Sequence, residues 1–93
     1  MGQHTLQLSE DCRRIEEFLN SRDVSPEVSL GCGIKKLKRR LSPGGYFLFH
    51  AQEIYGNPAF NIPEKRVFAA LNELVSQGKA KTHHHSGLIW YSL

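Results

Sequence analysis

Three consecutive histidines, His83, His84 and His85, are the residues whose type and spacing most directly suggest chemistry. Side chains alternate between the two faces of a β-strand, so within a strand His83 and His85 would share one face and could chelate a metal ion. A closed zinc site needs four ligands and an open site needs three. The residues that could complete such a site are His4, His50, Cys12 and Cys32. None has a spacing that commits it to the histidines, so we expect an exposed strand that holds no metal.

Motifs for catalysis are absent from the sequence. It contains no G-x-S-x-G motif, no Walker loop and no Cys-His pair at local spacing. Glu16 and Glu17 are adjacent, so on a helix they do not face the same side. His50 and Glu53 lie close together but have no nucleophile beside them, and we expect both on the surface. The sequence therefore predicts a protein that is not an enzyme and needs no cofactor.

The composition is that of one small globular domain. Of 93 residues, 40% are hydrophobic and 23% are charged, a balance typical of folded domains. No apolar run is long enough to span a bilayer, and the N-terminus lacks the apolar core of a signal peptide. Cys12 and Cys32 form no C-x-x-C pair, so we expect reduced thiols in an intracellular protein of the cytoplasm, nucleoid or nucleus, without a membrane partner.

Positive charge is concentrated in one block of the chain. The net charge is +3, and the sequence "KKLKRR" at residues 35–40 lies in a stretch that has no acid. A block of this kind attracts polyanions and steers their approach. A solvated helix face, a nuclear-import signal or an acidic protein partner would account for the same block.

The N-terminal part favours two helices. Ser9 is a good N-cap for a first helix, whose apolar face would hold Cys12, Ile15, Phe18 and Leu19. For residues 25–41, the Ser-Pro-Glu start and an apolar stripe spaced by four, three and four predict a second helix. That stripe consists of Leu30, Ile34, Leu37 and Leu41. The five bases would flank it and point outward.

The C-terminal part favours shorter elements around one strong helix. Residues 46–49 predict a short strand and residues 50–57 a short helix. Pro63 and Gly78 bracket the surest helix of the chain. Its expected core stripe is Val67, Ala70, Leu71, Leu74 and Val75. The runs on either side of Ser86-Gly87 predict a β-hairpin, with Ile89, Tyr91 and Leu93 facing the core and Trp90 facing the other way.

This order of elements resembles a winged helix-turn-helix from residue 33 to residue 93. In particular, "PEKRVFAALNELVSQGKA" followed by "SGLIWYSL" resembles the third helix and wing of small nucleic-acid-binding winged domains. The resemblance implies an α+β fold, mostly α, in which a three-helix core carries a short strand and a C-terminal β-hairpin wing. Residues 1–24 would form an N-terminal helical extension and residues 25–93 the winged-helix domain.

The stretch from Pro63 to Trp90 is also similar to the Z-form nucleic-acid-binding winged domains. Those domains use an asparagine and, four residues later, a tyrosine on the exposed face of the third helix. This sequence has Phe68 and Asn72 there, and the paired prolines of their wing are absent. Only Trp90 and Lys65 match, so the similarity implies the fold without specificity for the Z form.

The winged-helix resemblance implies a small DNA-binding protein that acts in transcription regulation or DNA maintenance. In that fold the third helix usually enters the major groove and the wing lies along the backbone. Asn72 could recognise adenine. The expected contacts to double-stranded DNA are Lys35, Lys36, Lys38, Arg39, Arg40, Lys65, Arg66, Asn72, Ser76, Lys79, Lys81, His83, His84 and His85. RNA is a further candidate ligand.

A second class of function is a winged helix that serves as a protein-interaction module in a larger assembly. Glu64 and Glu73 cancel the charges of Lys65 and Arg66, and a neutral third helix suits a polyanion poorly. The acidic first helix could dock to a protein partner or to a second copy of the chain. The residues expected at such an interface are Ile15, Phe18 and Phe68.

Overall fold

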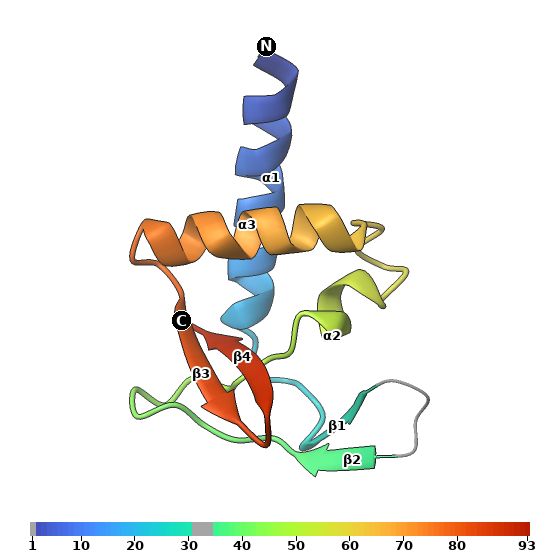
Figure 1. Cartoon of the computed structure of the whole chain (residues 1–93), viewed down its shortest axis with the longest axis vertical. Helices are drawn as coiled ribbons and strands as arrows, with labels where there is room; N and C mark the ends of the chain where they lie inside the picture. Colours follow the sequence, from blue (N-terminus) through green and yellow to red (C-terminus); the bar gives the residue numbers. More distant parts are fainter. Residues whose placement is uncertain (1, 31–34) are drawn as a thin grey trace.

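The computed structural model describes residues 2–30 and 35–93 of the chain; the side chains of residues 1–6 and 30–35 lie outside that description. Within these described residues, three helices and two antiparallel strand pairs make a small mixed α and β fold (Figure 1). The elements are α1 (Gly2–Leu19), β1 (Glu27–Leu30), β2 (Lys35–Lys38), α2 (Gln52–Tyr55), α3 (Glu64–Ser76), β3 (Lys81–His85) and β4 (Leu88–Ser92). Among the described residues, no helix is both long and apolar enough to cross a membrane.

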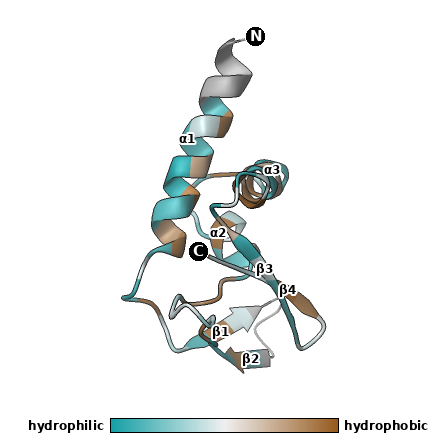
Figure 2. Cartoon of the chain, turned by 90° about the vertical axis from the view of Figure 1, so that its left-hand side faces the viewer, coloured by the Kyte–Doolittle hydropathy of each residue, from teal (hydrophilic) through white to brown (hydrophobic). Residues whose placement is uncertain are grey.

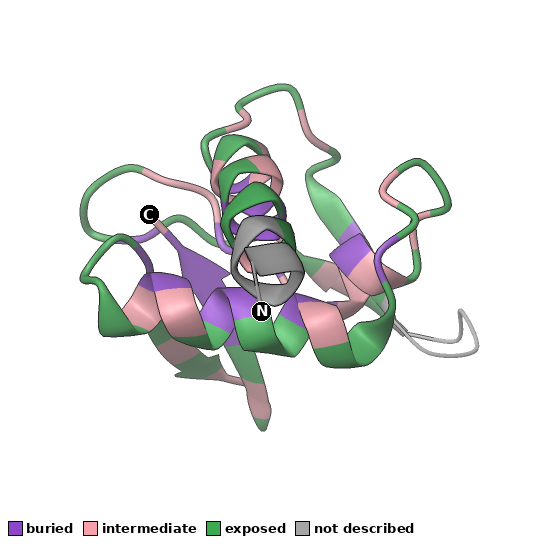
Figure 3. Ribbon diagram, turned by 90° about the horizontal axis from the view of Figure 1, so that it is seen from above, coloured by how far each residue is buried: buried purple, intermediate pink, exposed green. Residues whose placement is uncertain are grey.

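Helix α1 begins at Gly2, so Ser9 lies inside the helix and not at its N-cap as expected. The expected apolar face is confirmed, because Ile15 and Leu19 are fully buried and Cys12 is 9% exposed. These side chains pack against α3, which α1 crosses (Figure 1), and Figure 3 shows buried segments of both helices near the crossing. Because α1 shares the main core, its side chains stabilise the same body as those of residues 49–91.

The helix predicted for residues 25–41 is wrong. Residues Glu27–Leu30 and Lys35–Lys38 form an antiparallel strand pair, with Val28 opposite Leu37. Gly31 and Gly33, each costing a helix about 1 kcal/mol relative to alanine, fall between the strands, and residues 31–34 lie outside the described part of the chain. Leu41, expected in the apolar stripe of that helix, is 58% exposed.

The strand expected at residues 46–49 is reduced to two isolated bridges. Leu41 pairs with Phe47, and Phe49 pairs with Tyr91 of β4. In the second bridge the Phe49 amide donates to the Tyr91 carbonyl at 2.8 Å, and the Tyr91 amide donates back at 2.7 Å. The short helix α2 follows at once, so this bridge ties the middle of the chain to its C-terminal hairpin.

Helix α3 and the β3–β4 hairpin confirm the predictions for the C-terminal part. Pro63 precedes α3, whose side chains Val67, Ala70, Leu71 and Leu74 are all buried. The hairpin turns at Ser86 and Gly87, which have φ values of 55° and 73°. One residue of the expected core face was wrongly predicted: Ile89 is 46% exposed, although Tyr91 and Leu93 pack in the main cluster.

Two apolar clusters lie on the two sides of the β4 strand. The main cluster joins α1, α2 and α3 with Phe49 and Tyr91. The smaller cluster joins Val28, Leu48 and Trp90, with Leu37 and Leu88 packed at its edge. Figure 2, which looks along α3, shows the β1–β2 pair at the end of the molecule away from the N-terminus. The second cluster therefore fixes the β1–β2 pair to the β3–β4 hairpin.

Candidate nucleic-acid interface

The basic block lies on β2 and on the extended segment that follows it, and alternation along a strand separates its side chains. Leu37 turns inward to the smaller apolar cluster, and Lys36 and Lys38 are exposed on the opposite face. Lys35 pairs with Leu30 through the backbone. Arg39 turns inward again and Arg40 is exposed. The strand therefore presents only part of the block to solvent.

Arg39 is an internal anchor and not an outward-facing base, contrary to the expectation. Its side chain is 3% exposed and forms a two-pronged ion pair with Glu53, at 2.6 and 3.0 Å. Arg39 also donates to the carbonyls of Ser25 and Leu48 at 2.7 and 2.9 Å and lies over the Phe49 ring. The expectation that Glu53 is a surface residue is also wrong, because this carboxylate is 16% exposed.

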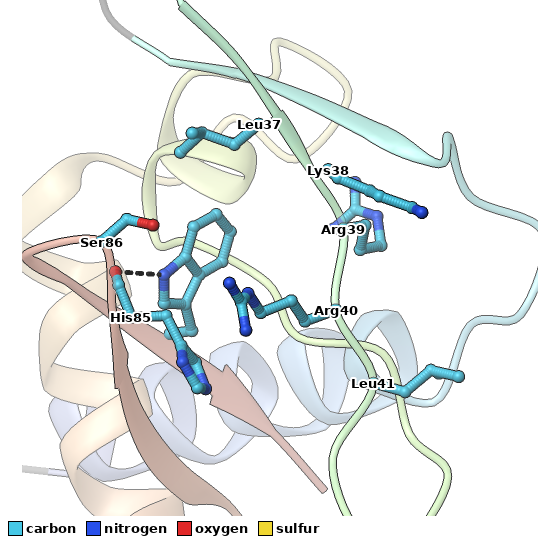
Figure 4. A pocket seen from close by; sticks show the side chains of 8 residues that line it. Leu37, Lys38, Arg39, Arg40, Leu41, His85 and Ser86 are labelled. Atoms are coloured by element: carbon cyan, nitrogen blue, oxygen red, sulfur yellow. Dashed lines mark hydrogen bonds between the residues drawn. The ribbon is translucent and has the colours of Figure 1, made fainter.

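Arg40 lines a cavity between the basic segment and the tip of the β3–β4 hairpin. Residues 37–41 form one wall, and His85, Ser86 and Trp90 form the other, around a volume of about 520 Å³. In Figure 4 the Arg40 side chain extends toward His85, whereas the Lys38 and Leu41 side chains point the other way. The structure thus brings the basic block and the last histidine together, although they are far apart in sequence.

Trp90 and His50 pack behind this cavity. Trp90 is 5% exposed, and its indole Nε1 donates to the His85 carbonyl at 3.1 Å. The His50 ring meets the indole edge to face, with centroids 5.7 Å apart. The Gln52 amide donates to Nδ1 of His50, which fits a neutral imidazole. Burial lowers the pKa of His50, and the Glu53 carboxylate offsets part of that effect. Trp90, which the similarity to Z-form domains singled out, is therefore a side chain of the smaller apolar cluster in this structure.

The three histidines alternate on β3 as expected. His83 and His85 stack on one face with ring centroids 6.5 Å apart, and His84 is exposed. Nε2 of His83 lies 2.8 Å from the Ser92 hydroxyl. The pKa of His83 is lowered, first by burial and then by the nearby charges of His85 and Lys81. Within the described residues, no group of three or more His, Cys, Asp or Glu side chains is placed to hold a metal ion.

Helix α3 presents a separate surface across the middle of the molecule, away from the β1–β2 pair that carries the basic segment (Figures 1 and 2). Lys65, Asn72 and Ser76 are exposed on it, as expected. Arg66 is engaged by Asp11 of α1 through hydrogen bonds of 3.0 and 2.9 Å. The hydrogen bond to Asp11 is the main reason that the pKa of Arg66 is raised. Arg66 thus joins α1 to α3.

The three residues expected at a protein interface differ in their surroundings. Ile15 is fully buried inside the molecule. Phe18 packs on Phe49 and Phe60, with ring centroids 4.6 and 5.1 Å away. Phe68 is 37% exposed and lies 6.2 Å from the Tyr55 ring. Of the three, Phe68 alone offers a large accessible apolar surface.

The remaining bases, Lys79 and Lys81, are exposed at the start of the C-terminal hairpin. Sequence reasoning missed the roles of two other residues of this region, Glu53 and Ser86, whereas Trp90 was singled out by the similarity to Z-form domains. The Glu53 pairing spans 14 residues and leaves no local pattern. For Ser86 a signal existed, since a serine stood where a tight hairpin turn requires a positive φ.

No protein-family model, no curated protein and no solved structure matches the chain. The geometry of its own residues is therefore the basis of the functional assignment.

Proposed function

We propose that this protein is a non-enzymatic nucleic-acid-binding domain that binds double-stranded DNA through the basic surface of its two hairpins. The observation that carries the proposal is that one base of the basic block is paired inside the molecule while others remain exposed. Arg39 is committed to Glu53, whereas Lys36, Lys38 and Arg40 are exposed, and His85 faces Arg40 across the cavity. Exposed cations grouped along one short segment are the electrostatic footprint of a polyanion partner.

A winged-helix architecture is part of the same proposal. Its support is the order α1, Phe49 bridge, α2, α3 and β3–β4 hairpin, in which Phe49 pairs with β4 as the first strand of a winged helix pairs with its wing. In this interpretation α1 is the first helix of the three-helix core, and the β1–β2 pair is inserted after it. The basic block then lies on the insertion, close to the wing.

Because the surface of α3 is neutral, we expect DNA binding to depend mainly on phosphate contacts made by the exposed cations of the basic block. Lys65 and Asn72 are available for base contacts, but Arg66 is held by Asp11. Contacts to phosphates carry no sequence information and weaken steeply with salt. A role in transcription regulation or DNA maintenance with modest sequence preference is consistent with this balance.

Titration with blunt duplex DNA at 50 and 200 mM salt tests the proposal. We expect Lys36→Gln, Lys38→Gln and Arg40→Gln each to lower the slope of log affinity against log salt by about 0.9 per lost phosphate contact. Lys65→Gln is the matched control on α3 and should change the slope less. Undetectable binding at 50 mM salt, or an unchanged slope in the three hairpin variants, would overturn the proposal.

A second candidate function, docking of a protein partner on α3, rests on the exposure of Phe68 beside Tyr55. An accessible aromatic side chain on a neutral surface is typical of a protein contact. Phe68→Ala should then remove partner binding and leave DNA affinity unchanged. Loss of DNA binding in this variant would instead place α3 against DNA.

A further inference from the structure

The cavity beside Arg40 is larger than a single phosphate contact requires. Its volume of about 520 Å³ lies within the range of about 300–1,000 Å³ that small-molecule sites occupy. A duplex presents its phosphates on a convex ridge, which can reach only the rim of such a hollow. A nucleotide that is not base-paired can enter it as a whole. The volume therefore favours an unpaired nucleotide.

The walls of the cavity match the two parts of a nucleotide. Leu37 and Trp90 supply an apolar wall for the sugar and base. Trp90 is only 5% exposed, so it offers no open ring face for stacking, and we expect little preference among bases. Arg40, His85 and Ser86 supply N–H and O–H donors for a phosphate.

The guanidinium of Arg40 is free to bind such a phosphate. Arg39, its neighbour, uses its donors on Glu53 and on two backbone carbonyls. The Arg40 carbonyl accepts a hydrogen bond from the Leu48 amide at 3.0 Å. Its guanidinium forms no hydrogen bond or ion pair with any residue in the described part of the chain and extends toward the hairpin tip (Figure 4). A free arginine fork aimed across a cavity is suited to bidentate contact with phosphate.

Ser86 adds an independent observation. Its φ of 55° is a left-handed conformation that disfavours residues with a Cβ, and glycine or asparagine is the usual choice at this position of a tight hairpin turn. Serine makes this turn less stable than glycine would, but it places a hydroxyl group at the cavity wall. Strain that persists at a cavity is a reason to suspect a role in binding.

We propose that this cavity binds an unpaired nucleotide, with its phosphate between Arg40 and the hairpin tip and its sugar and base along Leu37 and Trp90. The inference deepens the proposed DNA binding by naming the part of the nucleic acid that the cavity takes. Two sources share this chemistry: the end of a single-stranded overhang and a free nucleotide.

The fluorescence of Trp90 tests the proposal directly, because Trp90 is the single tryptophan of the chain. The intact protein is titrated with a blunt duplex, the same duplex with a three-nucleotide overhang, adenosine 5′-monophosphate, and adenosine as the control without phosphate. We expect the overhang to bind at least threefold more tightly than the blunt duplex and to change the emission. A response to the monophosphate without an effect of the overhang assigns the free nucleotide as the source. Equal affinity for both duplexes together with unchanged emission for every probe overturns the inference.

Two variants separate binding from folding. Arg40→Gln should weaken overhang or nucleotide binding about tenfold, because it removes a charged donor. Ser86→Gly should relieve the strained φ and raise the melting temperature, yet weaken the same binding about threefold. Arg22→Gln, at an exposed arginine that does not line the cavity, is the matched control and should change neither. Unchanged nucleotide affinity in both cavity variants overturns the inference, whereas absence of blunt-duplex binding in the parent protein rejects the proposed function alone.

Discussion

Arg39 and Arg40 are adjacent residues of one type, and the fold gives them opposite surroundings. Arg39 is 3% exposed and bound to Glu53, and Arg40 is exposed at the cavity. No local sequence feature distinguishes the two. Only the inward turn of Leu37 fixes which of the alternating side chains faces Glu53. The residue scale is therefore where prediction from sequence was weakest, because the decisive partners are distant in the chain.

Removing the internal arginine should destabilise the protein strongly. Arg39→Gln leaves the Glu53 carboxylate without its cation in a mostly buried site, a loss that typically costs about 3–5 kcal/mol. Arg40→Gln removes the same charge from the surface and should change stability by only about 0.5 kcal/mol. Urea unfolding of the two variants measures the difference. Equal losses in both would contradict the assigned roles.

His50 should make the stability of the fold depend on pH. Burial lowers the pKa of this imidazole, while Glu53 raises it in part. His83 has a pKa lowered by burial, by His85 and by Lys81. The unfolded chain, with histidine pKa values of about 6.5, then binds more protons than the folded chain as pH falls through 6.5. The stabilisation that the neutral imidazoles contribute should therefore be complete above pH 6.5. The free energy of unfolding should decrease as the pH falls below 6.5.

Thermal unfolding between pH 5 and pH 8 measures this dependence. The variant His50→Asn keeps an acceptor for the Gln52 amide and cannot be protonated, so we expect a smaller loss of stability at pH 5. His84→Asn is the control, since His84 is exposed. A pH profile that His50→Asn leaves unchanged would show that this imidazole does not carry the effect.

At the scale of elements, prediction succeeded where periodicity and end signals agreed. Pro63, the apolar stripe of α3 and Gly78 fixed one helix, and the Ser86-Gly87 turn fixed one hairpin. The helix prediction for residues 25–41 failed because apolar residues spaced by three and four are also compatible with two short strands. The glycines that weakened the helix were the evidence for the alternative. The cavity could not have been predicted, because it depends on packing between these two hairpins.

Helix α1 should be an integral part of the fold. Ile15 is fully buried in the core that α1 shares with α3, so Ile15→Ala should cost about 2–5 kcal/mol in unfolding free energy. Leu41→Ala, at a side chain that is 58% exposed, is the control and should change little. If Ile15→Ala were as mild as its control, residues 1–24 would behave as the separate extension predicted from the sequence.

At the scale of the whole molecule, the proposed ligand should stabilise the folded state through linkage. A ligand that binds only the folded chain adds about 2.7 kcal/mol at a concentration of 100 times Kd. For a domain of this size that corresponds to a rise in Tm of roughly 10–20 °C. The overhang duplex at low salt should produce this rise, and 0.5 M salt should remove it as phosphate contacts are screened. A rise that persists in 0.5 M salt would argue against an electrostatic interface.

Because Cys12 lies where α1 packs on α3, the reactivity of its thiol can report the motion of one helix relative to the other. Its Sγ lies under α1, 3.6 Å from the Ala70 carbonyl, and burial, followed by Glu73 and Asp11, raises the pKa of the thiol. Only the thiolate reacts with disulfide reagents, so labelling should wait for α1 to lift away from α3. In a Cys32→Ser chain the labelling rate of Cys12 should therefore report how often α1 separates from α3. Labelling should be slow while the two helices are packed together and faster in a variant that lacks the Arg66–Asp11 ion pair.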